Sequence, residues 1–254
     1  MQERYALELI EKDKRIDGRG LEEFRPIEIK ENLINTAEGS ADVRFGKTRV
    51  IAGVKLMLGE PFPDTPDEGM LIVNVEFTPL AAPEFESGPP REDAIELARV
   101  VDRGIRESKC IEVEKLVITP GEKVWCVFID IHIINHQGNL IDCAALASLV
   151  ALLNTKIPKL EDEKILRGDF EKDLPVVSKP ITITVGKVGD KFLLDPAYIE
   201  ENVLESKLSV AVRDDDSVCA MQKQGRDGLA IKDIEKMVDL VIKKSKEIRK
   251  LIKK

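Results

Sequence analysis

The chain has little that would suit a membrane or secreted protein. No apolar run approaches the ~20 residues needed to cross a bilayer, and the charged N-terminal stretch contains no signal-peptide hydrophobic segment. The four cysteines (Cys110, Cys126, Cys143 and Cys219) are scattered in apolar settings with no Cys-x-x-Cys pair. This pattern indicates reduced, buried thiols rather than disulfides or zinc ligands. We therefore expect a cytoplasmic protein with no membrane partner.

Groups that commonly carry catalysis are also scarce. No Ser-His-Asp or Cys-His arrangement and no nucleotide-binding glycine-rich loop is present. A Gly-Lys-Thr run at residues 46–48 lacks the earlier glycine of a phosphate loop and leads into a strand, so it indicates a hairpin turn. The only histidines, His132 and His136, share a strand side with Asp130, but no fourth metal ligand is suggested. The aspartates at 214–216 favour a solvated turn over a Mg²⁺ site.

The pattern of polar and apolar residues predicts an α+β protein with two similar lobes, because strands grouped in hairpins are followed by helices in each half. We expect an N-terminal helix within 1–16, a first lobe over 24–156, a linker over 157–180 and a second lobe over 181–252. Predicted strands lie at about 24–33, 40–46, 48–58, 70–80, 115–135 (a hairpin turning at Pro120-Gly121), 181–187, 190–195, 208–213 and 217–223. Predicted helices lie at 3–13, 91–109, 140–156 and 231–252.

One of these helices carries a basic stripe on an acidic chain, which has 39 Lys+Arg against 47 Asp+Glu. Arg99, Arg103 and Arg106 are four and three residues apart, which places them along one side of the helix. Two interpretations stay open from spacing alone. The arginines form ordinary solvated ion pairs with the carboxylates at positions 96, 102 and 107, or they meet an anionic partner.

Several stretches resemble the RNase PH family of phosphorolytic exoribonucleases and span nearly the whole chain in the family's order. They are 15–20 (RIDGRG), 39–55, the arginine helix (ELARVVDRGIRES), 138–152 and 192–211. Within the family the likeness is to the catalytically silent ring subunits of archaeal exosomes. The resemblance implies an RNase PH-like fold of two ribosomal-protein-S5-domain-2-like β-α lobes in pseudo-repeat.

The chain departs from active members of the family at two places. Where they carry a phosphate-binding Gly-Gly-Thr/Ser-Arg segment, this chain has residues 139–142, with Asp142 in the place of the arginine. Asp142 instead suits the N-terminus of its own helix. Where active members carry two aspartates for metal binding and acid chemistry, this chain has Glu201 and Lys207. A protonated lysine has no lone pair for a metal. The resemblance therefore implies no catalytic residue, no metal site and no cofactor in this chain.

The resemblance also implies partners and a binding surface. A catalytic RNase PH-like subunit would alternate with this chain in a six-membered ring, S1/KH-type RNA-binding proteins would form its cap, and single-stranded RNA would be bound. Arg99 and Arg103 match RNA-contacting arginines of the family, and Arg106, nearly a turn further along, is the third candidate. Two alternatives stay open: an active phosphorolytic 3′-5′ exoribonuclease that uses Glu201 with the aspartates at 214–216, and a structural ring spacer that never meets RNA.

Overall fold

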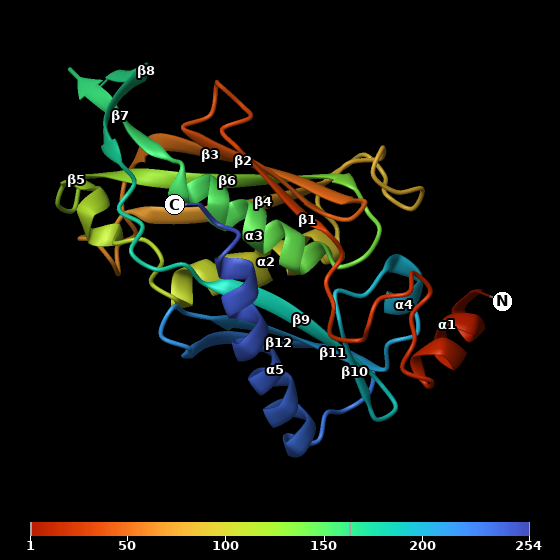
Figure 1. The fold of residues 1–254 in the computed structure, drawn as a ribbon. Coiled ribbons are helices and arrows are strands. Elements are labelled where there is room, and N and C mark those ends of the chain that lie inside the picture. Colours follow the sequence, from red (N-terminus) through yellow and green to blue (C-terminus); the bar gives the residue numbers. More distant parts are fainter. Residues whose placement is uncertain (1, 163, 254) are drawn as a thin grey trace.

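The computed structural model describes residues 2–162 and 164–253, which form two sheets with helices between and beside them (Figure 1). The first sheet has the order β1-β2-β3-β6-β4, and β5 pairs with the outer part of β6. Only β4 runs parallel to its neighbour, and the other pairs are antiparallel. The strands are β1 (Ile27–Glu31), β2 (Gly39–Phe45), β3 (Thr48–Gly59), β4 (Met70–Phe77), β5 (Val117–Thr119) and β6 (Lys123–Asn135).

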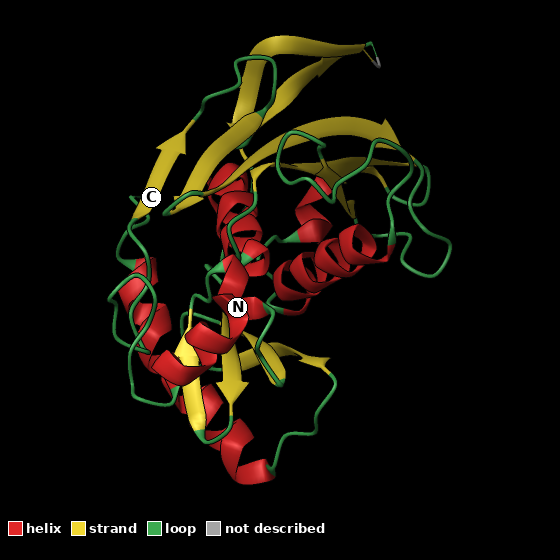
Figure 2. Ribbon diagram, turned by 90° about the vertical axis from the view of Figure 1, so that its right-hand side faces the viewer, coloured by secondary structure: helices red, strands yellow, loops and turns green. Residues whose placement is uncertain are grey.

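Two helices lie between this sheet and the second one (Figure 2). Helix α3 (Leu140–Leu153) packs on β2 and β3 with one side and on β9 (Ile181–Val188) with the other, which explains why its sequence is apolar almost all round. Helix α2 (Glu92–Glu107) packs on β4, α3 and β12 (Val218–Gly225). Its amphipathic sequence leaves the arginine stripe outside the core.

The second sheet is fully antiparallel in the order β10-β9-β11-β12. Its strands are β9 (Ile181–Val188), β10 (Lys191–Leu194), β11 (Ser206–Val212) and β12 (Val218–Gly225). Helix α5 (Ile231–Arg249) packs on β9 and β11, and the short α4 (Tyr198–Glu201) contacts the N-terminal α1 (Gln2–Ile10). A 3₁₀ turn, Val113–Leu116, precedes β5.

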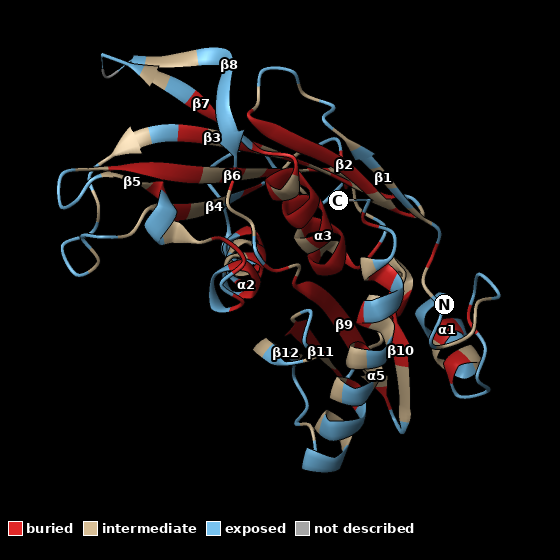
Figure 3. Cartoon of the chain, turned by 60° about the vertical axis from the view of Figure 1, so that its left-hand side comes forward, coloured by how far each residue is buried: buried red, intermediate tan, exposed pale blue. Residues whose placement is uncertain are grey.

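Side chains along β9 and β11 alternate between the two faces of this sheet, so each face packs against helices. Thr182 and Thr184 face the middle layer: Thr184 bonds to α3, and a Cβ at Gly104 of α2 would lie 3.2 Å from the Thr182 hydroxyl. Small polar residues on this face allow close approach of the helices. The residues on the opposite face, for example Ile183 and Val185, are aliphatic and buried. Strand β9 is buried along nearly its whole length (Figure 3).

The structure confirms the predicted helices and strands to within a few residues at their ends. The predicted turns at Gly46, Pro120-Gly121 and residues 214–216 are also present. The cysteines are unpaired thiols, buried except for the half-buried Cys219. Among the described residues, no helix is both long and apolar enough to cross a membrane.

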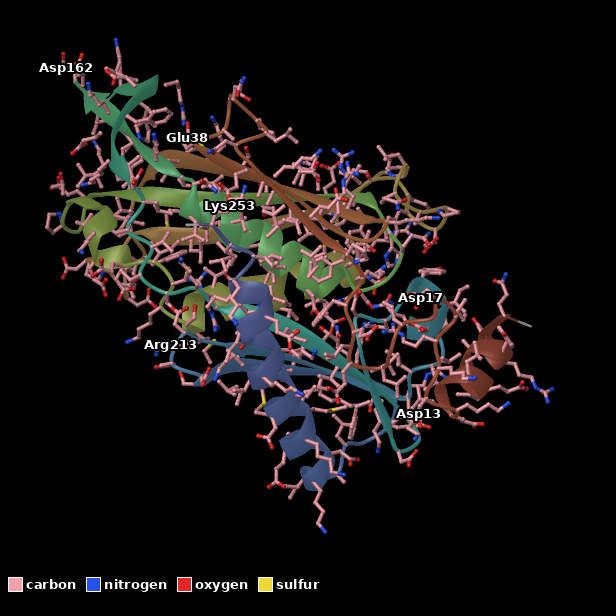
Figure 4. The ribbon with its side chains drawn as sticks, viewed as in Figure 1. Asp13, Asp17, Glu38, Asp162, Arg213 and Lys253 are labelled. Carbon is pink, nitrogen blue, oxygen red and sulfur yellow. The ribbon has the colours of Figure 1, made fainter. Side chains whose placement is uncertain are left out.

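The segment 157–180, which we expect to link the lobes, contains a hairpin that the sequence pattern did not reveal. Among the described strands, β7 (Lys156–Glu161) and β8 (Lys164–Asp173) pair only with each other. Most of β8 is exposed on both faces, so it lacks the polar–apolar alternation of a half-buried strand. Glu38 lies beside the base of the hairpin (Figure 4). It joins the hairpin to the first sheet, because its carboxylate accepts from Arg167 at 2.5 Å and from Lys55 at 3.3 Å. The proposed lobe boundaries stay predictions.

Candidate functional site

A cavity of about 220 Å³ lies between the two lobes, where the departures from the family pattern converge. Asn139, just before α3, and Leu140 and Ile141 of its first turn line the cavity, while Glu201 enters from α4 and Lys207 from β11. The remaining lining residues are Phe77, Glu84, Phe85, Asp93, Glu96, Leu97, His136, Thr184 and Gln224. Residues separated by more than sixty positions in the sequence thus meet in one place.

The loop before α3 is held in an unusual backbone conformation. Gly138 has φ +91°, and a Cβ there would lie 2.3 Å from the carbonyl oxygen of Pro196. Asn139 follows in the left-handed region with φ +56°. Its backbone N–H donates to the Glu201 carboxylate at 3.0 Å. A carboxylate of the chain itself therefore occupies the hydrogen-bonding position that a loop amide would offer to an anion.

The charges around the cavity are unfavourable for the binding of an anion such as phosphate. Four carboxylates line it, whereas Lys207 is the one ammonium among the lining residues. The Lys207 Nζ lies 3.9 Å from Glu201 Oε1, which is a long ion pair. Burial lowers the pKa of His136, so its imidazole is neutral near pH 7 and adds no positive charge. A phosphate dianion entering this cavity would meet net repulsion.

Asp142, which takes the place of the family's phosphate-binding arginine in the sequence, does not line this cavity. Its side chain is buried, and it accepts bonds from the Thr184 N–H (3.0 Å), the Thr184 hydroxyl (2.7 Å) and the Asn139 amide (3.0 Å). Burial raises its pKa to about 7, although these hydrogen bonds oppose the shift. Asp142 lies in the first turn of α3, as expected, but it binds across to the second lobe. The anion-repelling carboxylates are those that line the cavity, Glu201 among them.

Beside the cavity lies a buried charge cluster that sequence reasoning missed. Asp195 is fully buried and accepts from Arg25 at three nitrogens (2.6 to 2.8 Å), from Arg19 at 3.0 Å and from the Asn139 amide at 2.9 Å. Burial alone would raise the pKa of Asp195, but bonding to Arg25 outweighs it and lowers the pKa. Arg15 pairs with the buried Glu200. The family-like RIDGRG stretch was the available signal, yet nothing local in it indicates a partner about 180 residues away.

The cluster fastens the N-terminal segment to the second lobe. Arg15 also donates to the carbonyl oxygen of Leu194 at 2.8 Å, and Arg25 donates to those of Gln137 and Gly138 at 2.7 and 3.1 Å. These bonds connect the N-terminal segment, the loop before α3 and the end of β10. The loop that lines the cavity is therefore fixed by buried ion pairs rather than free to rearrange.

The arginine stripe is exposed, and its members have different partners. Arg99 makes no hydrogen bond or ion pair within the described parts of the chain. Arg103 donates to the Gln222 side chain of β12 at 3.0 Å. Arg106 pairs with Asp102 at 2.7 Å and donates to the Leu71 carbonyl of β4 at 2.9 Å. The ion pairs considered for Arg99 and Arg103 from spacing alone are absent among the described residues.

The two histidines are not arranged as metal ligands. His132 Nδ1 lies 3.1 Å from the Glu76 carboxylate, while Asp130 bonds to Asn74 at 3.1 Å. His136 stacks on Phe85, with 5.6 Å between ring centroids. Within residues 2–162 and 164–253, no group of three or more histidine, cysteine or acidic side chains is placed to hold a metal ion.

The aspartates at 214–216 serve the turn between β11 and β12. Asp214 accepts from the Lys179 N–H and Arg249, Asp215 caps Ser217, and Asp216 pairs with Lys246. None of the three lines the cavity that Glu201 enters. The structure therefore does not bring them together with Glu201, as an active alternative would require.

Comparison with known proteins matches both halves of the chain to one family. Residues 23–158 match the model of the 3′ exoribonuclease family, domain 1, and residues 179–244 match domain 2. The chain is 49% identical to "Exosome complex component Rrp42" of Methanosarcina mazei, over 97% of this chain and 91% of that protein. It is also 49% identical to the protein of the same name from Archaeoglobus fulgidus, over 98% and 95%.

Solved structures agree with this assignment. A chain of the structure titled "archaeoglobus fulgidus exosome with RNA bound to the active site" superimposes with a TM-score of 0.94 at 48% identity, covering 99% of this chain and 98% of that one. Rice Rrp46, at 20% identity and a TM-score of 0.72 over 94% and 98% of the two chains, shares the fold. The two-lobed RNase PH-like fold is thereby confirmed. The chain belongs to the 3′ exoribonuclease (RNase PH) family and carries both of its domains.

Proposed function

We propose that this chain is a non-catalytic ring subunit of an archaeal RNA exosome and takes part in 3′-to-5′ RNA degradation. The relatives of similar length carry the name of an exosome component, and one superimposable structure is described as an exosome with RNA bound. In this proposal the chain alternates with a catalytic RNase PH-like subunit in a six-membered ring. It completes the partner's active site, helps to hold RNA and supports S1/KH-type cap proteins.

Catalytic silence is carried by one observation: Glu201 accepts the Asn139 N–H at 3.0 Å inside a cavity lined by four carboxylates. Phosphorolysis needs inorganic phosphate as its nucleophile, and this arrangement opposes phosphate binding. The position of the second aspartate is held by Lys207, whose ammonium lies 3.9 Å from Glu201. A Mg²⁺ ion does not fit a site with that cation beside its remaining carboxylate.

Purified chain, incubated alone with single-stranded RNA, orthophosphate and Mg²⁺, is expected to release no nucleoside diphosphate. Adding a catalytic RNase PH-like partner that retains the Gly-Gly-Thr/Ser-Arg segment and both aspartates is expected to restore release. Glu201→Ala in this chain should leave the activity of the reconstituted ring intact, because the catalytic groups belong to the partner. Nucleoside diphosphate release by the chain alone would overturn the proposal.

RNA contact is proposed for Arg99 and Arg103, which are exposed residues of α2. Phosphate contacts without base readout suit a subunit that handles many sequences. Arg106 is the third candidate for RNA contact, because its guanidinium would first have to leave Asp102 and the Leu71 carbonyl. Replacing Arg99 and Arg103 by Glu in the reconstituted ring distinguishes RNA contact from a spacer role. If the ring assembles and RNA affinity is unchanged, the spacer role is correct.

A further inference from the structure

We propose that the cavity between the lobes binds an organic cation, namely an alkylguanidinium or alkylammonium group. This inference stands apart from the proposed exosome role, because it rests only on the chemistry of the cavity wall. The wall is rich in acceptors and poor in donors. Glu84, Asp93, Glu96 and Glu201 all line it, against the single ammonium of Lys207.

A buried acceptor in a residue of the cavity wall also lacks a hydrogen-bond partner. Asn139 is 2% exposed and lines the cavity, yet its Oδ1 has no hydrogen-bond partner among the described residues. Its Nδ2 donates to Asp142 and Asp195, so both amide hydrogens are used. Those two bonds fix the amide orientation, with the carbonyl oxygen turned away from both carboxylates. A second lining residue, Gln224, likewise has an unpartnered buried Oε1.

The carboxylates that remain after internal pairing lie on one side of the cavity. Glu201 is shared between the Asn139 N–H and Lys207, and Glu84 accepts from the Tyr198 hydroxyl at 2.9 Å. Asp93 and Glu96, on the first turns of α2, have no hydrogen bond or ion pair within the described residues. Two unpaired carboxylates can receive the parallel N–H groups of a guanidinium.

Size and the apolar part of the wall restrict the ligand further. At about 220 Å³ the cavity is smaller than the ~300–1,000 Å³ of typical small-molecule sites, so it suits a head group rather than a nucleotide. Phe77, Leu97 and Ile141 supply apolar wall. An aliphatic stem that ends in a cation matches both kinds of surface. Two sources carry this chemistry: a basic side chain of a neighbouring polypeptide and a free polyamine.

The probe for the test is butylguanidinium, and butylurea is its neutral counterpart of similar shape. Titration of the full chain, followed by calorimetry or amide NMR shifts, is expected to show that butylguanidinium binds about tenfold or more tightly than butylurea. Added salt should weaken the binding of butylguanidinium but not that of butylurea. Equal affinity of the two probes, or no binding of butylguanidinium, would overturn the proposal.

A matched pair of variants locates the binding. Glu96→Gln removes a lining carboxylate that has no internal partner. It should weaken the binding of butylguanidinium about fivefold. Glu92→Gln removes the same charge from an exposed residue of the same helix turn that does not line the cavity, and it should leave affinity unchanged. If both variants weaken binding equally, the effect is general electrostatics and the cavity is not the site. Asp93→Asn is a second lining variant in case Glu96→Gln fails to fold.

The same probe distinguishes the two sources once the cavity chemistry is established. If a neighbour's basic side chain fills the cavity, the assembled ring should no longer bind butylguanidinium although the chain alone does. If the natural ligand is free, chain and ring should bind it alike, and spermidine should compete. Each result supports a cation site. Competition by orthophosphate for the same cavity would contradict it.

Discussion

Asp142 and Thr184 join the two lobes of this protein. The Asp142 carboxylate, in the first turn of α3, accepts from the backbone N–H of Thr184 at 3.0 Å and from its hydroxyl at 2.7 Å. The Thr184 hydroxyl lies 2.8 Å from that of Ser209 on β11, which extends the contact across the second sheet. Because Asp142 is buried at this junction, its ionisation is linked to the stability of the whole fold.

The contribution of Asp142 to the stability of the chain should therefore fall as pH rises from about 4 to about 7. Burial raises the Asp142 pKa from 3.8 to about 7, so the folded state binds a proton in this window that the unfolded state has released. Each tenfold difference in proton affinity between the two states corresponds to ~1.4 kcal/mol of unfolding free energy. In Asp142→Asn this part of the pH dependence should vanish. Urea unfolding at several pH values measures it.

The comparison between wild type and variant is needed because other groups titrate nearby. The lowered pKa of His136 acts in the opposite sense, since the unfolded state binds that proton more tightly and stability rises with pH through the window. Subtracting the variant's curve from the wild-type curve isolates Asp142. Identical curves would contradict the raised pKa.

Asp195→Asn should cost about 3–5 kcal/mol of unfolding free energy, because it leaves the guanidinium of Arg25 buried without its counter-charge. Asp17→Asn is the matched control. Asp17 pairs with Arg19 at 2.7 Å, but its side chain is 39% exposed, so its loss should cost at most about 1 kcal/mol. Chemical denaturation of both variants tests the difference. Equal small losses would mean that the cluster is not needed for the fold.

The sequence predicted most of the fold because its elements are locally marked. The uninterrupted apolar, alanine-rich stretch of α3 and the turn residues Pro120-Gly121 each mark their element within a few positions. The hairpin β7–β8 was missed because β8 is exposed on both faces, so no alternation marks it. It is held by pairing with β7 and by Glu38, which is more than a hundred residues away.

The site was predictable only where the family resemblance supplied an alignment. Matching by family order placed residues 139–141, Glu201 and Lys207 together, and they do line one cavity. The direction in which a side chain points is not encoded in that alignment. Asp142 therefore proved to face Thr184, and Asp195 proved to be the centre of an arginine cluster.

Arg167→Ala should loosen the β7–β8 hairpin while the rest of the fold stays intact. Arg167 donates to Glu38 at 2.5 Å, which ties β8 to the first sheet, and the hairpin has no further sheet neighbour among the described strands. We expect faster amide hydrogen exchange confined to residues 156–173 and a change in global stability below about 1 kcal/mol. Lys172→Ala, which removes another β8 cation whose nearest carboxylate is 4.0 Å away, should leave exchange unchanged.

Single substitutions along the arginine stripe should distinguish arginines that are available to RNA from those that are held by bonds to other residues of the chain. Arg99→Ala should weaken the binding of single-stranded RNA to the ring several-fold. The slope of log affinity against log salt concentration should become shallower by about 0.7, the value for one phosphate contact on a single strand. It should not change unfolding free energy, because Arg99 makes no bond within the described residues. Arg103→Ala should do the same with a small stability cost from the lost bond to Gln222.

Arg106→Ala should show the reverse pattern. Its bond to the Leu71 carbonyl ties α2 to β4, so its loss should cost about 1 kcal/mol of unfolding free energy while RNA affinity changes less than in Arg99→Ala. Arg4→Ala, at an exposed arginine of α1, controls for the loss of one positive charge. Filter-binding titrations at several salt concentrations and urea denaturation give the two quantities. A larger RNA defect in Arg106→Ala than in Arg99→Ala would show that the anchored guanidinium is released to bind RNA and that its contacts in the free chain do not predict its role.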